Sequence, residues 1–415
     1  MVARVLGGML ASGAFNTSLC AAGCDCEAAL YEEDATSAAH RDLARRVGAA
    51  SAVLLKNEKG TLPLRPGARV VLAGSACSQR HVLAQSKNLD WRAGDYYVLG
   101  GSGRVIAKPE AAVSIRQGLE RRAVLAELRV SESDDVDEAL ALVRGNTDVV
   151  VACGGATSSE SLDRDDLKLD QHAFLLELAR RLRRPNRTVA SPPPTHEGPR
   201  LVVLALAPGT VLTPWAGDAD AAMVTFLAGE QSGNAWADVL LGEVNPSGRL
   251  PLTLPRSEED VVAPCTEEVC VYEERLAVGW RALVNQPVSF PFGHGLSYTR
   301  FEYSWLATPQ RHAASGEVRF SVRVANGGDV PGAEVCQVYL VYPEAAGEPP
   351  LVLRGFAKTA LLPPGGHADL VFALTPRDLS TYAAGGWVVS YGEFAVSVGA
   401  SSRDVRLRGP FRYSY

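Results

Sequence analysis

The sequence predicts an α/β sandwich with a mostly parallel sheet, followed by a second domain that is a β-sandwich. Two patterns carry this prediction. Between about residues 60 and 255, apolar strand-like runs alternate with helical periodicity, which is typical of a parallel sheet covered on both faces. After residue 300, short alternating strands follow one another with Gly and Pro turns and no helix-length pattern. The length of 415 residues allows two or three domains of ordinary size.

In the first region, apolar and β-branched runs predict the buried strands of the sheet. The strands are expected at residues 69–77, 148–153, 200–207 and 221–229. Helical spacing or capping residues predict helices between them, at residues 36–56, 111–123, 131–146, 169–184 and 233–242. Residues 123–130 fit a helix or a strand equally well.

The earliest of these helices rests on four apolar residues at helical spacing. They are Leu43, Val47, Ala50 and Leu54. Trp215 is expected to fill the core, and His294, between two glycines, is expected to be structural. In the second region, strands are expected at residues 316–328, 333–343, 367–374 and 392–401.

Composition excludes several classes of protein. A net charge of −6 argues against a nucleic-acid-binding surface, which normally carries a basic domain. No apolar run is long enough to predict a transmembrane helix. The sequons at residues 16–18 and 186–188 matter only in a secreted protein. Residues 184–199, with three consecutive prolines, predict a surface insertion in the α/β region.

The eight cysteines do not form a recognisable metal site. Cys20, Cys24 and Cys26 lie close together, but no second cluster or His pair accompanies them, so no metal is expected. Residues 265 and 270, both Cys, could close a small disulfide loop in an oxidising compartment. Positions 153 and 336 lie in apolar strand runs, where cysteines are expected to be buried thiols.

Polar and charged residues follow the predicted strand 148–153 in the segment GGATSSESLDR, residues 154–164. The carboxyl end of a strand in an open α/β sheet is where ligands usually bind. Glu160 is therefore a candidate for chemistry. The alternative is a solvated carboxylate near a helix N-terminus, and Asp163 could cap the helix that follows or order the site.

Several motifs resemble family 3 glycoside hydrolases, the group that includes β-glucosidases, β-xylosidases and exo-glucanases. FPFGHGLSYTRFEYS resembles the family's linker, and VNPSGRLPLTLP resembles the segment that closes its α/β sandwich. Further similar motifs occur at residues 51–64, 214–217 and 229–243. Residues 323–343, 353–366 and 397–405 resemble the family's fibronectin type III-like domain. The resemblance extends from about residue 36 to residue 409.

The resemblance implies roles for individual residues. Glu160 matches the general acid/base, and Asp163 and Arg164 match an Asp-Arg pair that orders the loop beside the sugar. The pattern has Gly before the Glu, and this chain has Ser159 instead. The segment 94–105 resembles a glycine-rich loop that approaches the sugar.

Within that segment the substrate-site residues are expected to be Gly101, Ser102 and Gly103. The implied activity is retaining hydrolysis of terminal β-linked sugars from oligosaccharides or glycosides, as in carbohydrate and polysaccharide catabolism. No metal or organic cofactor is expected. The resemblance also implies an extracellular or secretory location.

The family's nucleophile is an Asp on an N-terminal (β/α)₈ barrel, which needs about 250 residues. Only about 35 residues precede the resemblance here, and residues 4–15 resemble the last helix leaving the barrel. We therefore expect the part of the enzyme that carries the acid/base, without the nucleophile. The chain would be a truncated reading of a longer gene, the downstream half of a split enzyme with a separate barrel chain as partner, or a non-catalytic remnant.

The resemblance also predicts the domain organisation. A barrel-exit helix and linker would occupy residues 1–59, the α/β sandwich 60–256, a linker 257–302 and the fibronectin type III-like domain 303–415. Two other classes of function compete with the hydrolase. One is a non-catalytic carbohydrate-binding or scaffold protein, and the other, resting on the α/β pattern and a Gly-rich loop, is a flavodoxin-like nucleotide binder.

Overall fold

The computed structural model describes most of the chain, and the chain divides into two compact units, residues 1–43 and 44–415. The residues described are 2–13, 36–79, 91–105, 110–145, 148–183, 198–263, 265, 268–383 and 385–414. Helix α1 (Val2–Ala11) belongs to the first unit, and none of its residues is buried. The cysteines at positions 20, 24 and 26, both sequons and most of the predicted insertion lie outside the described residues.

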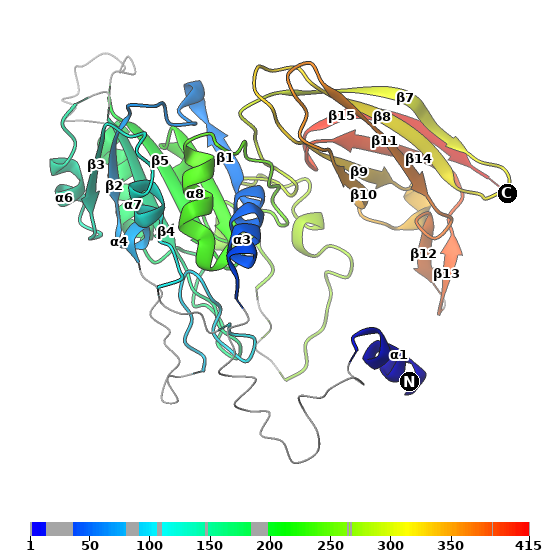
Figure 1. The fold of residues 1–415 in the computed structure, drawn as a ribbon. Coiled ribbons are helices and arrows are strands. Elements are labelled where there is room, and N and C mark those ends of the chain that lie inside the picture. The colour runs from blue at the N-terminus through cyan, green and yellow to red at the C-terminus, as the bar shows by residue number, and fades with distance from the viewer. Residues whose placement is uncertain are drawn as a thin grey trace, which may run out of the picture. The chain divides into compact units, whose positions relative to one another are not determined.

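A six-stranded sheet forms the centre of the α/β region (Figure 1). Its strand order is β1-β6-β5-β4-β2-β3, and every neighbouring pair is parallel except β1 with β6. The strands are β1 (Val53–Asn57), β2 (Arg69–Ala73), β3 (Glu127–Ser131), β4 (Val149–Gly155), β5 (Arg200–Ala207) and β6 (Ala221–Phe226). The predicted mostly parallel α/β sandwich is confirmed.

Helices cover both faces of this sheet. They are α3 (Ala38–Ser51), α4 (Ser75–Ser78), α5 (Ile115–Glu120), α6 (Val136–Ala141), α7 (His172–Arg183) and α8 (Ser232–Leu240). Alternate strand residues point to opposite faces. Val150 therefore joins the core formed with α6 and α7, where Trp215 is buried as predicted, whereas Val151 joins the core formed with α3, α4, α5 and α8.

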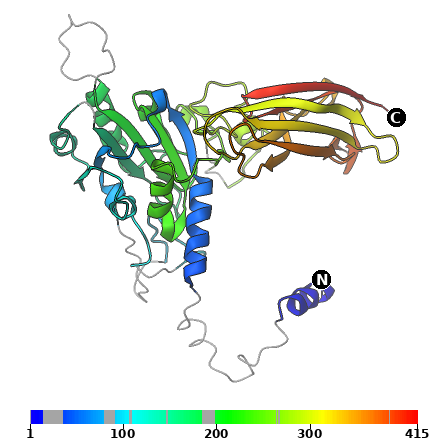
Figure 2. The same cartoon turned by 45° about the horizontal axis from the view of Figure 1, so that its top comes forward.

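Helix α3 differs from the prediction in its end and in its buried face. The segment from Val53 is strand β1, so Leu54 belongs to the sheet and not to the helix. The helix buries Gly48 and Ala49, and Leu43 and Val47 are exposed. An added Cβ at residue 48 would lie 3.0 Å from the Cβ of Ala235 on α8. Close packing through small residues brings α3 and α8 side by side in both views (Figures 1 and 2).

The second predicted domain is a β-sandwich, drawn from yellow to red in Figures 1 and 2. Its two main sheets have the strand orders β10-β9-β14-β15 and β11-β8-β7, and β12 pairs with β13. The strands are β7 (Phe301–Arg311), β8 (Val318–Asn326), β9 (Val335–Val341), β10 (Val352–Lys358), β11 (His367–Leu374), β12 (Ser380–Ala383), β13 (Gly386–Val389), β14 (Gly392–Gly399) and β15 (Val405–Tyr413). Alternate residues of β8, from Val318 to Val324, enter the core between the sheets.

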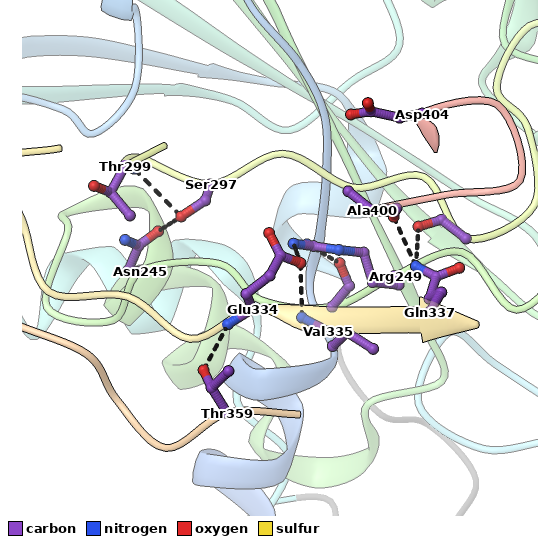
Figure 3. A network of polar contacts seen from close by, with 12 residues as sticks. Asn245, Arg249, Ser297, Thr299, Glu334, Val335, Gln337, Thr359, Ala400 and Asp404 are labelled. Atoms are coloured by element: carbon purple, nitrogen blue, oxygen red, sulfur yellow. Dashed lines mark hydrogen bonds and ion pairs between the residues drawn. The ribbon is translucent and has the colours of Figure 1, made fainter. Parts of the chain in front are cut away.

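A buried polar network joins the two domains (Figure 3). Arg249, in the segment that closes the α/β sandwich, forms an ion pair of 2.6 Å with Glu334 at the start of β9, and both side chains are buried. Gln337 of β9 donates to the carbonyl of Gly293 in the linker, at 3.0 Å. His294 has a structural place in the same linker, since its Nε2 lies 2.8 Å from the carbonyl oxygen of Leu55.

Two disulfides lie within the described residues. Cys265 and Cys270 close the small loop considered from the sequence. The expectation of a buried thiol at Cys153 is wrong, because it pairs with Cys77 across a Cα–Cα distance of 5.2 Å. That disulfide ties α4 to β4. Cys336 is buried and free, as predicted. Both disulfides would need an oxidising environment to form and persist.

The buried disulfide is expected to contribute strongly to stability, because it joins residues separated by 76 positions. The chain-entropy relation gives about 4.5 kcal/mol for a loop of this length. The double variant Cys77→Ala/Cys153→Ala should therefore lose several kcal/mol of unfolding free energy in urea titration. Cys336→Ala is the control, since it removes a buried thiol without opening a loop. Cys77 and Cys153 are fully buried, so the pairing is checked by alkylating the protein after denaturation without reduction. Peptide mapping that finds residues 77 and 153 alkylated under those conditions would contradict the pairing.

None of the helices within the described ranges has the length and apolar character needed to cross a membrane.

Candidate active site

Two loops meet at the carboxyl ends of the neighbouring strands β2 and β4. One follows β4 and carries Glu160; the other lies between β2 and β3 and carries the turn at residues 100–103. Their backbones pair directly: the N–H of Gly100 donates to the carbonyl of Ser158 at 3.0 Å, and the N–H of Glu160 donates to the carbonyl of Gly100 at 3.2 Å. This edge of an open α/β sheet is the usual place for a ligand.

The turn holds the carboxyl group of Glu160. The backbone N–H of Ser102 donates to Oε2 at 2.7 Å, and the Ser102 hydroxyl donates to the same oxygen. Gly101 makes this approach possible. Its φ is +113°, and an added Cβ would lie 2.5 Å from the Cβ of Glu160. A side chain at residue 101 would therefore push the turn away from the carboxyl group.

Glu160 is exposed to solvent, and the two hydrogen bonds from Ser102 lower the pKa of its carboxyl group. Hydrogen bonds to the charged form of an acid favour that form. At neutral pH the side chain is thus a carboxylate that can accept a proton. A general acid needs a raised pKa, which burial against apolar surface provides. The site therefore needs a cover before Glu160 could donate a proton.

The two loops that carry the carboxyl group and the turn also carry large exposed apolar side chains. Trp91, Leu99, Val105 and Leu162 are each between 42% and 70% exposed. Apolar side chains gathered on a surface mark a place that another protein part or a ligand covers. Such a cover would remove Glu160 from water.

Arg164 fixes the base of the loop that carries Glu160. Its Nη1 donates to the carbonyl of Thr210 at 3.0 Å, and its Nη2 donates to the carbonyl of Lys168 at 2.9 Å. These bonds tie the loop after β4 to the loop after β5. Asp163 is exposed and makes no hydrogen bond or ion pair that the described residues supply. The capping interpretation of Asp163 is wrong, because α7 begins only at His172.

A buried amide and a buried phenol connect the strand ends below the site. The side chain of Gln171 accepts from the N–H of Gly155 at 2.9 Å and donates to the hydroxyls of Ser75 and Tyr96. The Tyr96 hydroxyl donates to Asp170 at 2.7 Å. The network links the ends of β2 and β4 to the loop that carries Ser102, so it sets where the turn meets Glu160.

Across the described ranges, no three His, Cys, Asp or Glu side chains gather in a way that could hold a metal ion.

Comparison with known proteins decides the family. Residues 52–298 match the glycosyl hydrolase family 3 C-terminal domain, and residues 334–402 match the fibronectin type III-like domain. This chain belongs to glycosyl hydrolase family 3. The expectation from the sequence motifs is confirmed.

Curated family 3 relatives are similar along almost the whole chain. The probable β-glucosidase L of Emericella nidulans is 34% identical over 91% of this chain and 54% of its own length. The thermostable β-glucosidase B of Acetivibrio thermocellus is 30% identical over 93% of this chain and 49% of its own length. The chain thus spans about half the length of the curated relatives it matches.

Solved structures give the same result for the fold. The β-D-glucoside glucohydrolase of Trichoderma reesei superposes with a TM-score of 0.77 at 28% identity, covering 91% of this chain and 56% of that chain. The β-glucosidase 3B of Thermotoga neapolitana, in complex with glycerol, gives 0.72 at 28% identity, covering 91% and 54%. The α/β sandwich followed by the fibronectin-like domain is therefore shared with these family 3 structures.

Among the residues that the family 3 resemblance selects, the structure brings Glu160, Gly101 and Ser102 into contact. Gly103 lies in the same turn, but an added Cβ there would meet nothing within 4 Å. Arg164 braces the loop from below. The catalytic and sugar-binding roles of these residues remain predictions.

Neither Tyr96 nor Gln171 is expected as a site residue from the sequence motifs alone. One signal for Tyr96 is the glycine pair at residues 154 and 155, where the strand ends. An added Cβ at Gly155 would lie 2.6 Å from the Tyr96 ring. Paired glycines at a strand end indicate the close approach of another group. The partner itself lies 59 positions earlier in the sequence, so local pattern could not identify it.

Backbone conformation identifies Ser161 as a strained position in this family 3 loop. Its φ is +63°, and Ser159, where the family pattern has Gly, has no positive φ. A left-handed conformation costs a non-Gly residue about 1–2 kcal/mol. Replacing that residue with Gly removes this cost, but the greater freedom of Gly in the unfolded chain cancels part of the gain. Ser161→Gly should raise the unfolding free energy by about 0.5–1 kcal/mol in urea titration. Ser159→Gly is the matched control and should bring no gain; equal gains would contradict the explanation.

Proposed function

We propose that this chain supplies the acid/base carboxyl group of a retaining glycoside hydrolase of the β-glucosidase type. Glu160 would protonate the glycosidic oxygen as it leaves and later remove a proton from the attacking water. The substrate would be a terminal β-linked sugar on an oligosaccharide or glycoside. This chemistry serves carbohydrate catabolism.

One observation carries the proposal: the turn at residues 100–103 holds an exposed carboxyl group at the carboxyl ends of two adjacent parallel strands, on loops that also carry exposed apolar side chains. The carboxyl group is fixed by Ser102 and accessible to a ligand. The named family 3 relatives with similar sequences are β-glucosidases. A solvated loop carboxylate would not need a turn that Gly101 shapes to meet it.

Retaining hydrolysis needs a second carboxyl group about 5–5.5 Å from the first. By family resemblance we assign it to an Asp on a (β/α)₈ barrel outside these 415 residues. The barrel would cover the exposed apolar side chains on the two loops. Burial of the carboxyl group would then raise its pKa and allow it to donate a proton.

The test is to join this chain to the part of the Acetivibrio thermocellus β-glucosidase that it does not match. The joined protein should hydrolyse an aryl β-glucoside, and the chain alone should show no turnover above buffer. Turnover by the chain alone would show that the nucleophile lies within it. A joined protein that folds and binds glucose but remains inactive would contradict the acid/base assignment.

A second candidate is a non-catalytic carbohydrate-binding protein. The ionised and exposed state of Glu160 favours it, because such a carboxylate can accept hydrogen bonds from sugar hydroxyls but cannot donate a proton. Calorimetric titration of the chain with glucose and gluco-oligosaccharides tests this role. Binding that is lost in Glu160→Ala, together with an inactive joined protein, would favour binding over hydrolysis.

A further inference from the structure

The two oxygens of the Glu160 carboxyl group have different surroundings. Oε2 accepts both hydrogen bonds from Ser102. Oε1 has no hydrogen-bond partner in the part of the chain that the structure describes. This difference follows from the backbone of the turn, since the N–H of Gly101 donates to the carbonyl of Trp91 at 2.8 Å and the N–H of Arg104 donates to the carbonyl of Gly101 at 3.1 Å. Ser102 is thus held with both donors towards the carboxyl group.

We propose that Ser102 is a positioning residue for Glu160: its hydroxyl and its backbone N–H hold Oε2 against the turn, and the backbone N–H keeps the exchangeable proton on Oε1. The proposal deepens the hydrolase function above and rests on it only for the identity of the reaction. It changes the role of Ser102, which the sequence placed among the sugar-contacting residues of the loop. The serine acts on the carboxyl group instead.

The physical reason lies in the difference between the two donors. A hydroxyl both donates and accepts, so the Ser102 side chain could rotate and accept a hydrogen bond from a protonated Oε2. The backbone N–H can only donate. A proton on Oε2 would therefore face the hydrogen of the Ser102 N–H, whereas a proton on Oε1 leaves both hydrogen bonds in place. Oε1 is the oxygen that would exchange a proton with a glycosidic oxygen or with water.

The charge state of the carboxyl group is consistent with this geometry. The hydrogen bonds from the Ser102 side chain and backbone are the causes that lower the pKa of Glu160, and slight burial opposes them. No charged side chain is among the causes that shift the pKa of Glu160. The nearby Arg104 donates from Nη1 to the carbonyl of Ala93, and Arg164 donates to the carbonyls of Thr210 and Lys168. Removal of the hydroxyl should therefore act on Glu160 directly.

The experiment is a pH titration of the Glu160 side-chain carboxyl carbon by NMR, on the full chain labelled with ¹³C-glutamate and assigned with Glu160→Gln. Ser102→Ala should move the titration midpoint of Glu160 to higher pH than in the wild type, because one donor to the carboxylate is gone. Ser102→Thr keeps a hydroxyl and should restore the wild-type midpoint. The measurement uses no sugar, so its outcome is independent of whether the chain takes part in hydrolysis.

Ser159→Ala is the matched control. Ser159 lies beside Glu160, but its hydroxyl donates to the Glu160 backbone carbonyl at 3.1 Å and not to the carboxyl group. In Ser159→Ala the titration midpoint of Glu160 should equal that of the wild type. An unchanged midpoint in Ser102→Ala, or an equal shift in Ser159→Ala, would overturn the proposal. Because residue 102 is exposed, both Ser102 variants should keep the wild-type melting temperature.

Discussion

Glu160→Gln is expected to lower kcat of the joined enzyme by about 10²- to 10⁴-fold, the range for loss of one general acid/base group. The amide can accept hydrogen bonds as the carboxylate does but cannot transfer a proton. The loss should be largest for glycosides with poor leaving groups, because these need protonation as the bond breaks. Steady-state kinetics with a series of aryl β-glucosides, from activated to unactivated, measures this dependence.

Glu259→Gln is the matched control, because residue 259 is also an exposed glutamate but lies in the short helix η4 (Glu258–Asp260). It should keep the wild-type kcat. A uniform loss for Glu160→Gln across the leaving-group series would indicate a role in binding rather than in proton transfer. Equal losses in both variants would indicate a general effect of removing charge.

Glu334→Gln is expected to destabilise the junction of the two domains by about 3–5 kcal/mol, the usual result of removing one partner of a buried ion pair. Arg249 would remain buried without its counter-charge; the two side chains are 7% and 5% exposed. Burial raises the pKa of the Glu334 carboxyl group, and Arg249 opposes that effect. Urea titration followed by tryptophan fluorescence should show an earlier first transition.

Two comparisons make the prediction specific to the buried pair. Glu317→Gln removes a partly exposed partner of the exposed Arg319 in the same domain and should change stability by less than about 1 kcal/mol. The double variant Arg249→Met/Glu334→Gln leaves no unpaired charge and should recover part of the loss. A double variant as unstable as the sum of two single variants would contradict a direct interaction.

The fold could be predicted where one element carries one strong pattern. The β-branched runs of β2, β4 and β5 are apolar on both faces, and only a covered parallel sheet buries such runs. Strand β1 was missed because Leu54 continues the helical spacing of the preceding apolar residues. The pattern of large side chains was misleading there, since α3 packs against α8 through Gly48 and leaves Val47 exposed.

The site could be predicted only in part, for a similar reason. Position along a strand end and family motifs select Glu160 and the turn at residues 100–103. They do not select the contact itself, because Ser102 is 58 positions away from Glu160 in the sequence. The disulfide between Cys77 and Cys153 is also a contact between distant residues. Each of these contacts depends on β2 and β4 being neighbours, and strand order is not encoded in any local pattern.

The central claim is that Glu160 is the proton-transferring carboxyl group of a retaining hydrolase. Azide rescue of Glu160→Ala in the joined enzyme tests it most directly, because the small anion can enter the space left by the carboxyl group and attack the glycosyl intermediate without proton transfer. With an activated aryl β-glucoside we predict a rate that rises with azide and a β-glucosyl azide product. A variant whose rate does not respond to azide, or a product of the α configuration, would contradict the claim.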